Sequence, residues 1–379
     1  MGKTLTEIAQ QLKGANKKVQ LIYAFNGTGK TRLSRAFKQE IDPKTGGDDA
    51  PSSDLAEKKI LYYSAFTEDL FYWDNDLGLD AEPKLMIQPN AFTKWVLEEQ
   101  GQDQSITTTF QRYTSEKLTP QFSADFSSVS FSFERGNNQQ EPHIKISKGE
   151  ESNFIWSVFN ALLEQVISEL NTPEVADRST DAFNNLTYVF VDDPVSSLDD
   201  NHLIELAVNL AGLIKSSHSD LKFIITTHSP LFYNVLHNEL DLSKKGKNDG
   251  CYLLERREDG SFDLTVKHGD SNKSFSYHLH LLKSIEQAIA DSRVERFHFT
   301  LLRNLYEKTA SFLGYPRWSE LLPDDRQLYL NRIIQFTSHS TLSNEAVAQP
   351  TPQECATVKL LLDHLKSNYG FWQQEEQNA

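Results

Sequence analysis

The residues best suited to chemistry near the start of the chain form a glycine-rich turn between two predicted elements. The turn follows the apolar run 19–23, and a helix is expected from about Arg32 to Lys38. Backbone N–H groups of such a turn can surround a β-phosphate, while a lysine neutralises charge and a threonine hydroxyl binds Mg²⁺. The residues in these roles are Asn26, Gly27, Thr28, Gly29, Lys30 and Thr31. The turn therefore predicts a nucleoside triphosphate site, although Ala24 replaces the usual first glycine.

Two neighbouring carboxylates close a second predicted buried strand, 188–193. Asp192 is placed to hold the Mg²⁺ shell, and Asp193 is placed to polarise the attacking water as general base. A third apolar run, 223–228, ends at His228, which is expected to contact the γ-phosphate. Together with the turn, these residues predict triphosphate hydrolysis.

Two further segments are expected to contribute to this site, the first of them from another subunit. Ser147, Gly149 and Glu150 precede the apolar-periodic stretch 153–170, so they should lie at a helix N-terminus, where the dipole and free N–H groups attract phosphate. Asp199 ends the segment that follows the paired carboxylates. Because such a site is shared between chains, we expect a head-to-tail dimer or a higher homo-oligomer.

In this order, the motifs resemble those of ABC-type ATPases of the SMC branch, over roughly residues 1–250. Asp193 stands where most relatives carry glutamate, which sets the carboxylate about one methylene back and favours slow hydrolysis. Lys148 replaces a common glycine, and no glutamine occupies the expected Q-loop near 64–70, with Gln88 as the one candidate substitute. No sustained heptad pattern occurs between the two phosphate motifs, so long coiled-coil arms and a DNA-repair clamp are disfavoured.

Composition and charge restrict the remaining classes. The 379 residues contain no apolar run near the ~18 needed to span a bilayer and no signal-peptide core at the N-terminus. Two cysteines give neither a disulfide framework nor metal-ligand spacing, so we expect a cytoplasmic protein without membrane contact. Of the net charge of −15, residues 1–250 carry −12 and residues 251–379 only −3. The C-terminal part can therefore present a local basic patch to nucleic acid.

The pattern predicts an α/β chain with an ABC-type P-loop ATPase domain at 1–250 and a mainly α-helical domain at 251–379, the boundary lying between 245 and 280. Segments 251–255 and 261–267 predict a hairpin that either closes the ATPase sheet or begins the second domain. Helices are expected at 278–290, 293–313, 323–334 and 351–367.

Charged residues in the second of these helices are the other candidates for chemistry. Its buried stripe is expected to contain Phe297, Leu301, Leu305 and Phe312. Arg303 and Glu307 are four residues apart and share another face, where an ordinary surface ion pair is the simplest interpretation. His339 follows in a polar loop, where a solvent-exposed or capping histidine is usual.

The whole chain closely resembles the PrrC family of tRNA anticodon nucleases, through segments 1–12, 21–31 and 192–202. In that family a C-terminal domain uses an Arg, a Glu four residues later and a distant His, which Arg303, Glu307 and His339 match. The resemblance also implies a wobble-base recognition element, for which a solvated turn is the alternative interpretation. The matching residues are Lys267, Gly269, Asp270 and Ser271.

The three catalytic residue types can cleave RNA without a metal. Glu307 can remove the 2′-hydroxyl proton, His339 can protonate the departing 5′-oxygen, and Arg303 can bind the phosphate oxygens with two N–H groups. The residue types also allow the reverse order, with His339 as the base and Glu307 as the acid. The products would be a 2′,3′-cyclic phosphate and a 5′-hydroxyl, and the unstacked bases of an anticodon loop suit recognition by aromatic side chains.

The resemblance further implies the ligands and partners. These are ATP or GTP with Mg²⁺, dTTP as a candidate regulatory ligand, a type I restriction–modification complex that silences the nuclease, and a phage-encoded peptide that activates it. Cleavage of tRNA-Lys on the 5′ side of the wobble base is the implied reaction, in defence against phage. The alternative hypothesis is a regulatory ABC ATPase of a defence complex that has no nuclease activity of its own.

Overall fold

The computed structural model describes ten stretches of the chain. They are residues 2–43, 55–64, 70–75, 82–135, 139–195, 200–242, 250–257, 259–267, 277–338 and 350–369. The chain divides into two compact units, Met1–Gly269 and Asp270–Ala379, and each is described by itself. No helix among these stretches combines the length and apolar character needed to cross a membrane.

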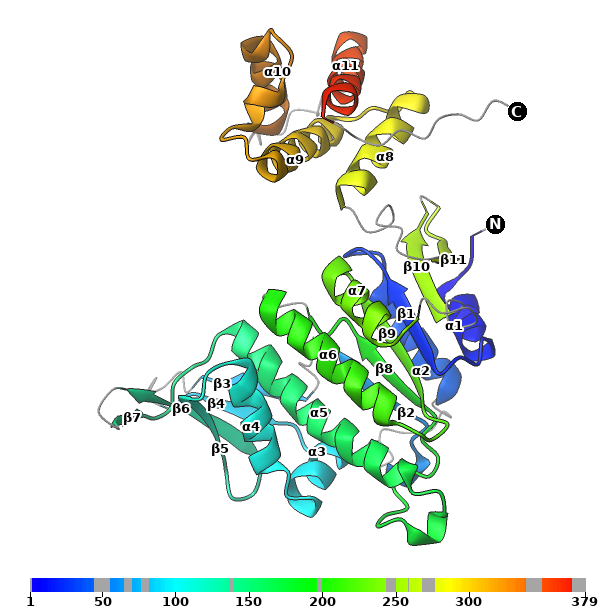
Figure 1. Cartoon of the computed structure of the whole chain (residues 1–379), viewed down its shortest axis with the longest axis vertical. Coiled ribbons are helices and arrows are strands. Elements are labelled where there is room, and N and C mark those ends of the chain that lie inside the picture. The colour runs from blue at the N-terminus through cyan, green and yellow to red at the C-terminus, as the bar shows by residue number, and fades with distance from the viewer. Residues whose placement is uncertain are drawn as a thin grey trace. The chain divides into compact units, whose positions relative to one another are not determined.

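The first unit is built on a six-stranded sheet of order β11-β10-β1-β9-β8-β2 (Figure 1). All neighbouring strands are parallel except β10 and β11, which form the predicted hairpin and close the sheet through the β1–β10 pairing. The strands are β1 (Val19–Tyr23), β2 (Ile60–Ser64), β8 (Tyr188–Asp192), β9 (Lys222–Thr227), β10 (Cys251–Arg256) and β11 (Phe262–Val266). The inner strands are largely apolar because helices cover both faces of the sheet.

Helices α1 (Leu5–Gly14) and α2 (Lys30–Ile41) cover one face of this sheet, and α5 (Lys148–Asn171), α6 (Asp200–Ser216) and α7 (Pro230–Glu239) cover the other (Figure 1). The hydrophobic core on the α1 and α2 face includes Ile8, Leu33, Phe37, Ile22, Phe190 and Ile224. The predicted phosphate-site helix and the long helix after Ser147 are thus confirmed as α2 and α5. The ATPase motifs consequently meet at the C-terminal ends of β1, β8 and β9, the edge where parallel sheets bind ligands.

A second, antiparallel sheet occupies the segment between α2 and α5. Its strand order is β3-β4-β6-β5, with β7 beside β6. The strands are β3 (Phe71–Asp74), β4 (Lys84–Ile87), β5 (Leu118–Phe122), β6 (Ser128–Arg135) and β7 (Gln139–Glu141), accompanied by α3 (Ala91–Lys94) and α4 (Asp103–Tyr113). Compact structure therefore stands where coiled-coil arms would leave an SMC ATPase.

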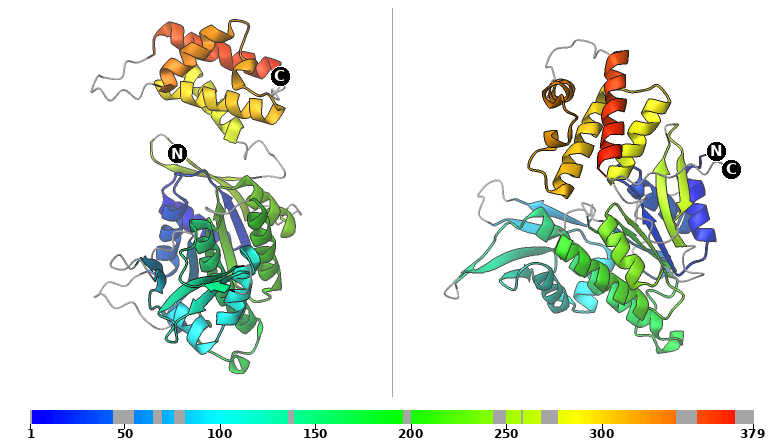
Figure 2. Two further views of the ribbon diagram at one scale, coloured as in Figure 1. Left: turned by 90° about the vertical axis from the view of Figure 1, so that its left-hand side faces the viewer. Right: turned by 45° about the horizontal axis from the view of Figure 1, so that its top comes forward.

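In its described residues, the second unit has four α-helices around one apolar core, together with the short 3-10 helix Trp318–Leu321 (Figure 2). The four α-helices are α8 (Tyr277–Ala290), α9 (Arg296–Leu313), α10 (Arg326–Ser338) and α11 (Pro352–Asn368). All four were predicted from the sequence, and Gly314 ends α9 in the left-handed conformation with φ of 78°.

The buried stripe predicted for α9 was wrong in part. Phe297 is 51% exposed and Phe312 is 89% exposed, while Leu305 is fully buried. The face that packs on the neighbouring helices contains His298, Phe299, Leu302, Leu305, Tyr306, Thr309 and Ala310. Partner helices select this face, and it includes a histidine and a threonine that an apolar pattern passes over.

Candidate functional site

Two glycines shape the phosphate-binding turn between β1 and α2. Gly27 has φ of +79° and Gly29 has φ of +115°, which are left-handed values that side chains with a Cβ rarely adopt. Gly29 is the N-cap of α2, so the free N–H groups of the first helical turn point out of the helix beside Lys30 and Thr31. Asn26 and Thr28 complete the turn, and the Thr28 N–H donates to the Phe25 carbonyl. The backbone therefore has the form that a phosphate group requires.

The Lys30 ammonium is buried within this turn and paired with Asp193. Its Nζ lies 3.2 Å from Asp193 Oδ2, 3.1 Å from Asn26 Oδ1 and 3.3 Å from the Ala24 carbonyl oxygen. The side chains of Lys30 and Asp193 are 8% and 7% exposed. A phosphate that binds here competes with the Asp193 carboxylate for the Lys30 ammonium.

Asp193 also binds His228, so the sheet edge brings three predicted residues together. His228 Nδ1 lies 2.8 Å from both Asp193 carboxylate oxygens, and the His228 backbone N–H donates to Oδ1 at 3.2 Å. Burial alone would raise the pKa of Asp193, but the His228 hydrogen bonds and the charge of Lys30 outweigh it and lower the pKa. Asp193 is therefore held ionised, the state that a general base requires.

Asp192 occupies a different environment, beside Thr31, the other residue predicted to hold Mg²⁺. Thr226 donates a 2.7 Å hydrogen bond to Oδ1, Tyr62 donates at 3.3 Å to Oδ2, and the Thr31 side chain also hydrogen-bonds this carboxyl. Burial raises the pKa of Asp192 despite the hydrogen bonds from Thr226 and Thr31. A carboxylate beside a hydroxyl is an oxygen pair that Mg²⁺ prefers, so the residues fit the predicted ion.

The residues predicted to act from another subunit lie at the start of α5. Ser147 is the N-cap: its hydroxyl accepts from the Glu150 N–H at 3.3 Å, and the Glu150 carboxylate accepts from the Ser147 N–H at 2.7 Å. Gly149 lies in the first helical turn and Ser147 is exposed. This reciprocal capping fixes the helix N-terminus at the protein surface. Asp199 lies outside the described residues.

Arg303 and Glu307 form an ion pair on α9 in the second unit. Arg303 Nε lies 2.8 Å from Glu307 Oε1, and the two side chains are 36% and 39% exposed. The Arg303 guanidinium also lies over the Trp318 ring, 5.9 Å from its centre. The predicted shared face is confirmed, and both side chains are accessible to a ligand. His339 lies outside the described residues, as do Gly269, Asp270 and Ser271.

Lys267, by contrast, is buried in the first unit at the end of β11. It is 5% exposed, and its Nζ lies 5.1 Å from the centre of the Tyr233 ring on α7. Its backbone N–H donates to the Cys251 carbonyl. A contact between the Lys267 ammonium and RNA therefore requires the ammonium to leave this position.

Sequence reasoning missed three residues that shape the site: Tyr62, Thr226 and Tyr233. Thr226 gave a signal, since it is one of two buried threonines at the end of β9 and lies beside Asp192 on the neighbouring strand. Tyr62 and Tyr233 gave none, because aromatic residues are common in strands and in buried helix faces.

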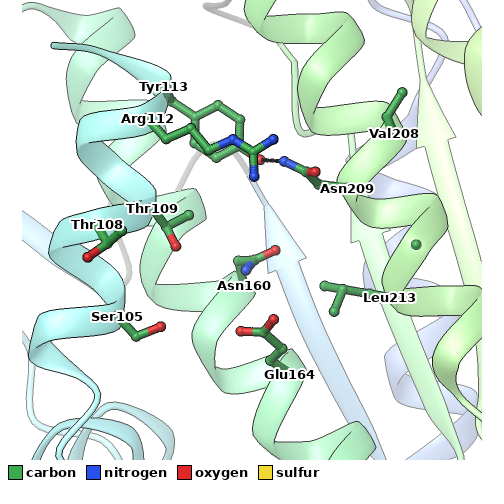
Figure 3. A pocket seen from close by; sticks show the side chains of 11 residues that line it. Ser105, Thr108, Thr109, Arg112, Tyr113, Asn160, Glu164, Val208, Asn209 and Leu213 are labelled. Carbon is green, nitrogen blue, oxygen red and sulfur yellow. Dashed lines mark hydrogen bonds between the residues drawn. The ribbon is translucent and has the colours of Figure 1, made fainter. Parts of the chain in front are cut away.

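A cavity of about 670 Å³ lies elsewhere in the first unit, between α4, α5 and α6 (Figure 3). Its floor is α5, and its walls contain side chains of Ser105, Thr108, Thr109, Arg112, Tyr113, Val208, Asn209 and Leu213. None of the residues predicted to bind nucleotide or RNA lines this cavity.

Comparison with known proteins identifies the family to which the chain belongs. A family model described as an AAA domain matches residues 104–365. An Escherichia coli protein named anticodon nuclease is 68% identical over 402 aligned positions, which cover the whole of both chains.

Solved SMC structures show a more distant likeness. The SMC head domain from Thermotoga maritima has 13% identity and a TM-score of 0.30, and an SMC head bound to the C-terminal winged-helix domain of ScpA has 12% and 0.34. Each match covers 67% of this chain and 91% of the other. The sheet topology and the family match show the fold of the first unit. The chain belongs to the anticodon nuclease family, and its first unit has the P-loop ATPase fold.

Proposed function

We propose that this protein is a nucleotide-gated endoribonuclease that cleaves tRNA in the anticodon loop. The observation that carries the proposal is the 68% identity to an anticodon nuclease along the whole chain. The accessible Arg303–Glu307 pair supports it, because a guanidinium and a carboxylate on one helix face can bind and deprotonate one nucleotide.

In this proposal the second unit cleaves RNA by attack of the 2′-hydroxyl on the adjacent phosphate. Glu307 takes the 2′-hydroxyl proton, Arg303 stabilises the charge that develops on the phosphate oxygens, and His339 protonates the departing 5′-oxygen. The products are a 2′,3′-cyclic phosphate and a 5′-hydroxyl. The substrate is tRNA-Lys, cut on the 5′ side of the wobble base, and Lys267, Gly269, Asp270 and Ser271 recognise that base.

The first unit is proposed to gate this reaction by binding ATP or GTP with Mg²⁺. Lys30 and the glycine turn hold the phosphates, and Thr31 and Asp192 hold the ion. Asp193 and His228 act on the γ-phosphate side. Ser147, Gly149 and Glu150 complete the site from a second copy of the chain, and Asp199 also contributes to nucleotide binding. The pairing of Lys30 with Asp193 supports the gate, because phosphate binding must exchange this ion pair for another.

The biological setting belongs to the same proposal and is taken over from the family resemblance. It comprises antiphage defence, silencing by a type I restriction–modification complex, release by a phage-encoded peptide and dTTP as a regulatory ligand. The first unit's buried acidic pair and P-loop suit any of the three nucleotides.

Incubation of the purified full-length protein with total tRNA tests the proposal. With ATP or GTP and Mg²⁺ present, new 5′-hydroxyl ends should map to one anticodon-loop position. Nucleotide hydrolysis without tRNA cleavage would instead favour the alternative function, a regulatory ATPase of a defence complex.

A further inference from the structure

An aromatic ring from outside α9 lies against the Arg303 guanidinium. Trp318 begins the short 3-10 helix that follows α9, and the Arg303 Cζ atom lies over its ring, 5.9 Å from the centre. At this distance the negative face of an indole ring attracts a guanidinium, and tryptophan is the aromatic residue that does so most strongly. The contact therefore ties a residue of the proposed nuclease site to a segment that has no charged group in that site.

The Trp318 ring is itself supported by buried groups. Leu321, at the end of the 3-10 helix, is fully buried, and its carbonyl accepts a 3.2 Å hydrogen bond from His364 Nε2 on α11. The Trp318 ring meets the Tyr306 ring edge-on, with ring centres 6.3 Å apart. The Tyr306 hydroxyl in turn donates to the Leu361 carbonyl at 2.8 Å. Since these neighbours belong to the core of the second unit, Trp318 is a rigid support.

Arg303 is restrained by Glu307 as well as by Trp318. Arg303 Nε donates to Glu307 Oε1 at 2.8 Å, but both side chains are more than a third exposed, and water weakens ion pairs of this kind. When Glu307 takes the proton of the 2′-hydroxyl, it also loses its negative charge, so its hydrogen bond with Arg303 becomes weaker. The contact between Arg303 and Trp318 does not depend on the charge of Glu307 and persists through this step.

We propose that Trp318 is a positioning residue for RNA cleavage, which holds the Arg303 guanidinium in place while Glu307 changes its charge. The inference rests on the proposed function, in which Arg303 stabilises the charge on the phosphate oxygens. Trp318 contacts neither the phosphate nor the 2′-hydroxyl and acts through Arg303. A planar guanidinium can lie flat on an indole ring and still donate two parallel hydrogen bonds, so the arrangement requires arginine at position 303.

Single-turnover cleavage of tRNA by the purified full-length protein, in excess over tRNA and with nucleotide and Mg²⁺ present, tests this role. Trp318→Leu should lower the rate constant at saturating protein about tenfold, which is part of the ~10²-fold loss expected for Arg303→Ala. The protein concentration that gives half of this rate should change by less than about twofold, because the charge that Arg303 stabilises develops in the transition state. Trp318→Phe keeps an aromatic face and should retain about a third of the wild-type rate or more.

A double variant separates positioning from folding. In an Arg303→Ala protein there is no guanidinium to position, so adding Trp318→Leu should change the remaining rate by less than about twofold. The matched control is Tyr369→Leu, which removes another partly buried ring that packs on the same core. This control should cleave at the wild-type rate, and the melting temperatures of all variants show how much each ring contributes to folding.

The outcomes distinguish this inference from the function on which it rests. Wild-type cleavage by Trp318→Leu, beside a defective Arg303→Ala protein, would overturn the role of Trp318 and leave the proposed function standing. A tenfold loss from Trp318→Leu in both backgrounds, or an equal loss in Tyr369→Leu, would show that the ring only supports the fold. Wild-type cleavage by Arg303→Ala would refute the assigned nuclease site and, with it, the positioning role.

Discussion

The ammonium of Lys267 lies 5.1 Å from the centre of the Tyr233 ring, and both side chains are buried in the first unit. Tyr233 is on α7, which begins two residues after His228, and its ring packs edge-on against Tyr23 at the base of the phosphate-binding turn, with ring centres 6.2 Å apart. A residue assigned to RNA is thus held by side chains that adjoin the nucleotide site.

The first prediction concerns the reactivity of Lys267 towards an amine-specific reagent, followed by mass spectrometry. An aromatic face stabilises a desolvated ammonium by about 2 kcal/mol, so Tyr233→Leu should label Lys267 roughly thirtyfold faster than the wild type. Tyr233→Phe keeps the ring and should label as the wild type does. Lys222 over Tyr188, at 5.5 Å, is an internal control whose labelling should not change. Equal labelling of Lys267 in the two Tyr233 variants would rule out the aromatic contact as its restraint.

The paired carboxylates should respond in opposite directions when each is replaced by asparagine. Burial raises the pKa of Asp192, so its ionised form destabilises the folded protein. The stability from the protonated form is present below the unfolded pKa and is lost as pH rises through the folded pKa. Asp192→Asn should therefore unfold at a higher temperature than the wild type at pH 8, by ~2–4 °C for each kcal/mol gained in the free energy of unfolding. The difference in melting temperature should become smaller towards pH 4.

Asp193→Asn is the matched comparison, because the pKa of Asp193 is lowered. Its ionised form stabilises the fold above the unfolded pKa, and this stability is lost as pH falls through the folded value. The asparagine leaves the Lys30 ammonium without its carboxylate, so the variant should unfold at a lower temperature than the wild type at pH 8. Thermal unfolding measures the stability of both variants. Phosphate release measures nucleotide hydrolysis, which should be lost in each. A melting temperature that falls in both would show that the two sites do not differ as described.

The sequence predicted the central sheet well because its strands are buried on both faces. Runs such as 19–23 and 188–192 are apolar at nearly every position, a pattern that is typical of strands buried on both faces. The second sheet was not predicted, since β3 and β4 have only four residues each and mix exposed and buried positions. Short half-exposed strands carry too few residues for a period of two to stand out.

The candidate site, too, was predicted only in part from the sequence. Motif spacing located Lys30, Asp193 and His228, but their mutual pairing depends on a backbone turn at Asp193, where φ is +51°. No residue pattern marks an aspartate for that left-handed conformation. The sequence also placed Lys267 with the RNA-binding residues, whereas its burial follows from the packing of α7 on the sheet. Contacts between elements distant in the chain are what the sequence could not supply.

A third prediction tests the nuclease assignment. Arg303→Ala, Glu307→Ala and His339→Ala should each reduce tRNA cleavage by ~10²-fold or more, the usual effect of losing a proton-transfer group or a charge that stabilises the transition state. Nucleotide binding should stay at the wild-type level, because it belongs to the first unit. The matched control is Arg293→Ala, which removes another surface ion pair of the second unit, with Asp291.

The melting temperatures of these variants separate chemistry from folding. The Arg303–Glu307 pair is more than a third exposed and should stabilise α9 by only ~0.3–0.5 kcal/mol. Loss of cleavage with unchanged melting therefore indicates a catalytic role. Cleavage retained in the His339→Ala protein would refute the assigned acid.

A fourth prediction tests whether two chains share each nucleotide site. In the proposed shared site, one chain contributes Lys30 and the other contributes the N-terminus of α5. Lys30→Ala removes the lysine that binds phosphate, and Ser147→Arg places a bulky cation at the N-terminus of α5. Each variant alone should be inactive in nucleotide hydrolysis. In an equal mixture half of the dimers contain one chain of each kind, and such a dimer has one complete site of two. The mixture should therefore recover about a quarter of the wild-type rate if the dimer is head-to-tail.

Loss of the helix cap is a second way in which Ser147→Arg can reduce hydrolysis, because Ser147 also caps α5. Removing such a cap lowers the free energy of unfolding by ~1 kcal/mol. Ser147→Ala removes the cap without adding bulk and is the control for this effect: a hydrolysis rate near that of the wild type would assign the Ser147→Arg defect to the blocked contact. Recovery in the mixture can arise only where Lys30 of one chain meets Ser147 of another. A mixture as inactive as its components, with dimers still formed, would mean that each chain builds its nucleotide site alone.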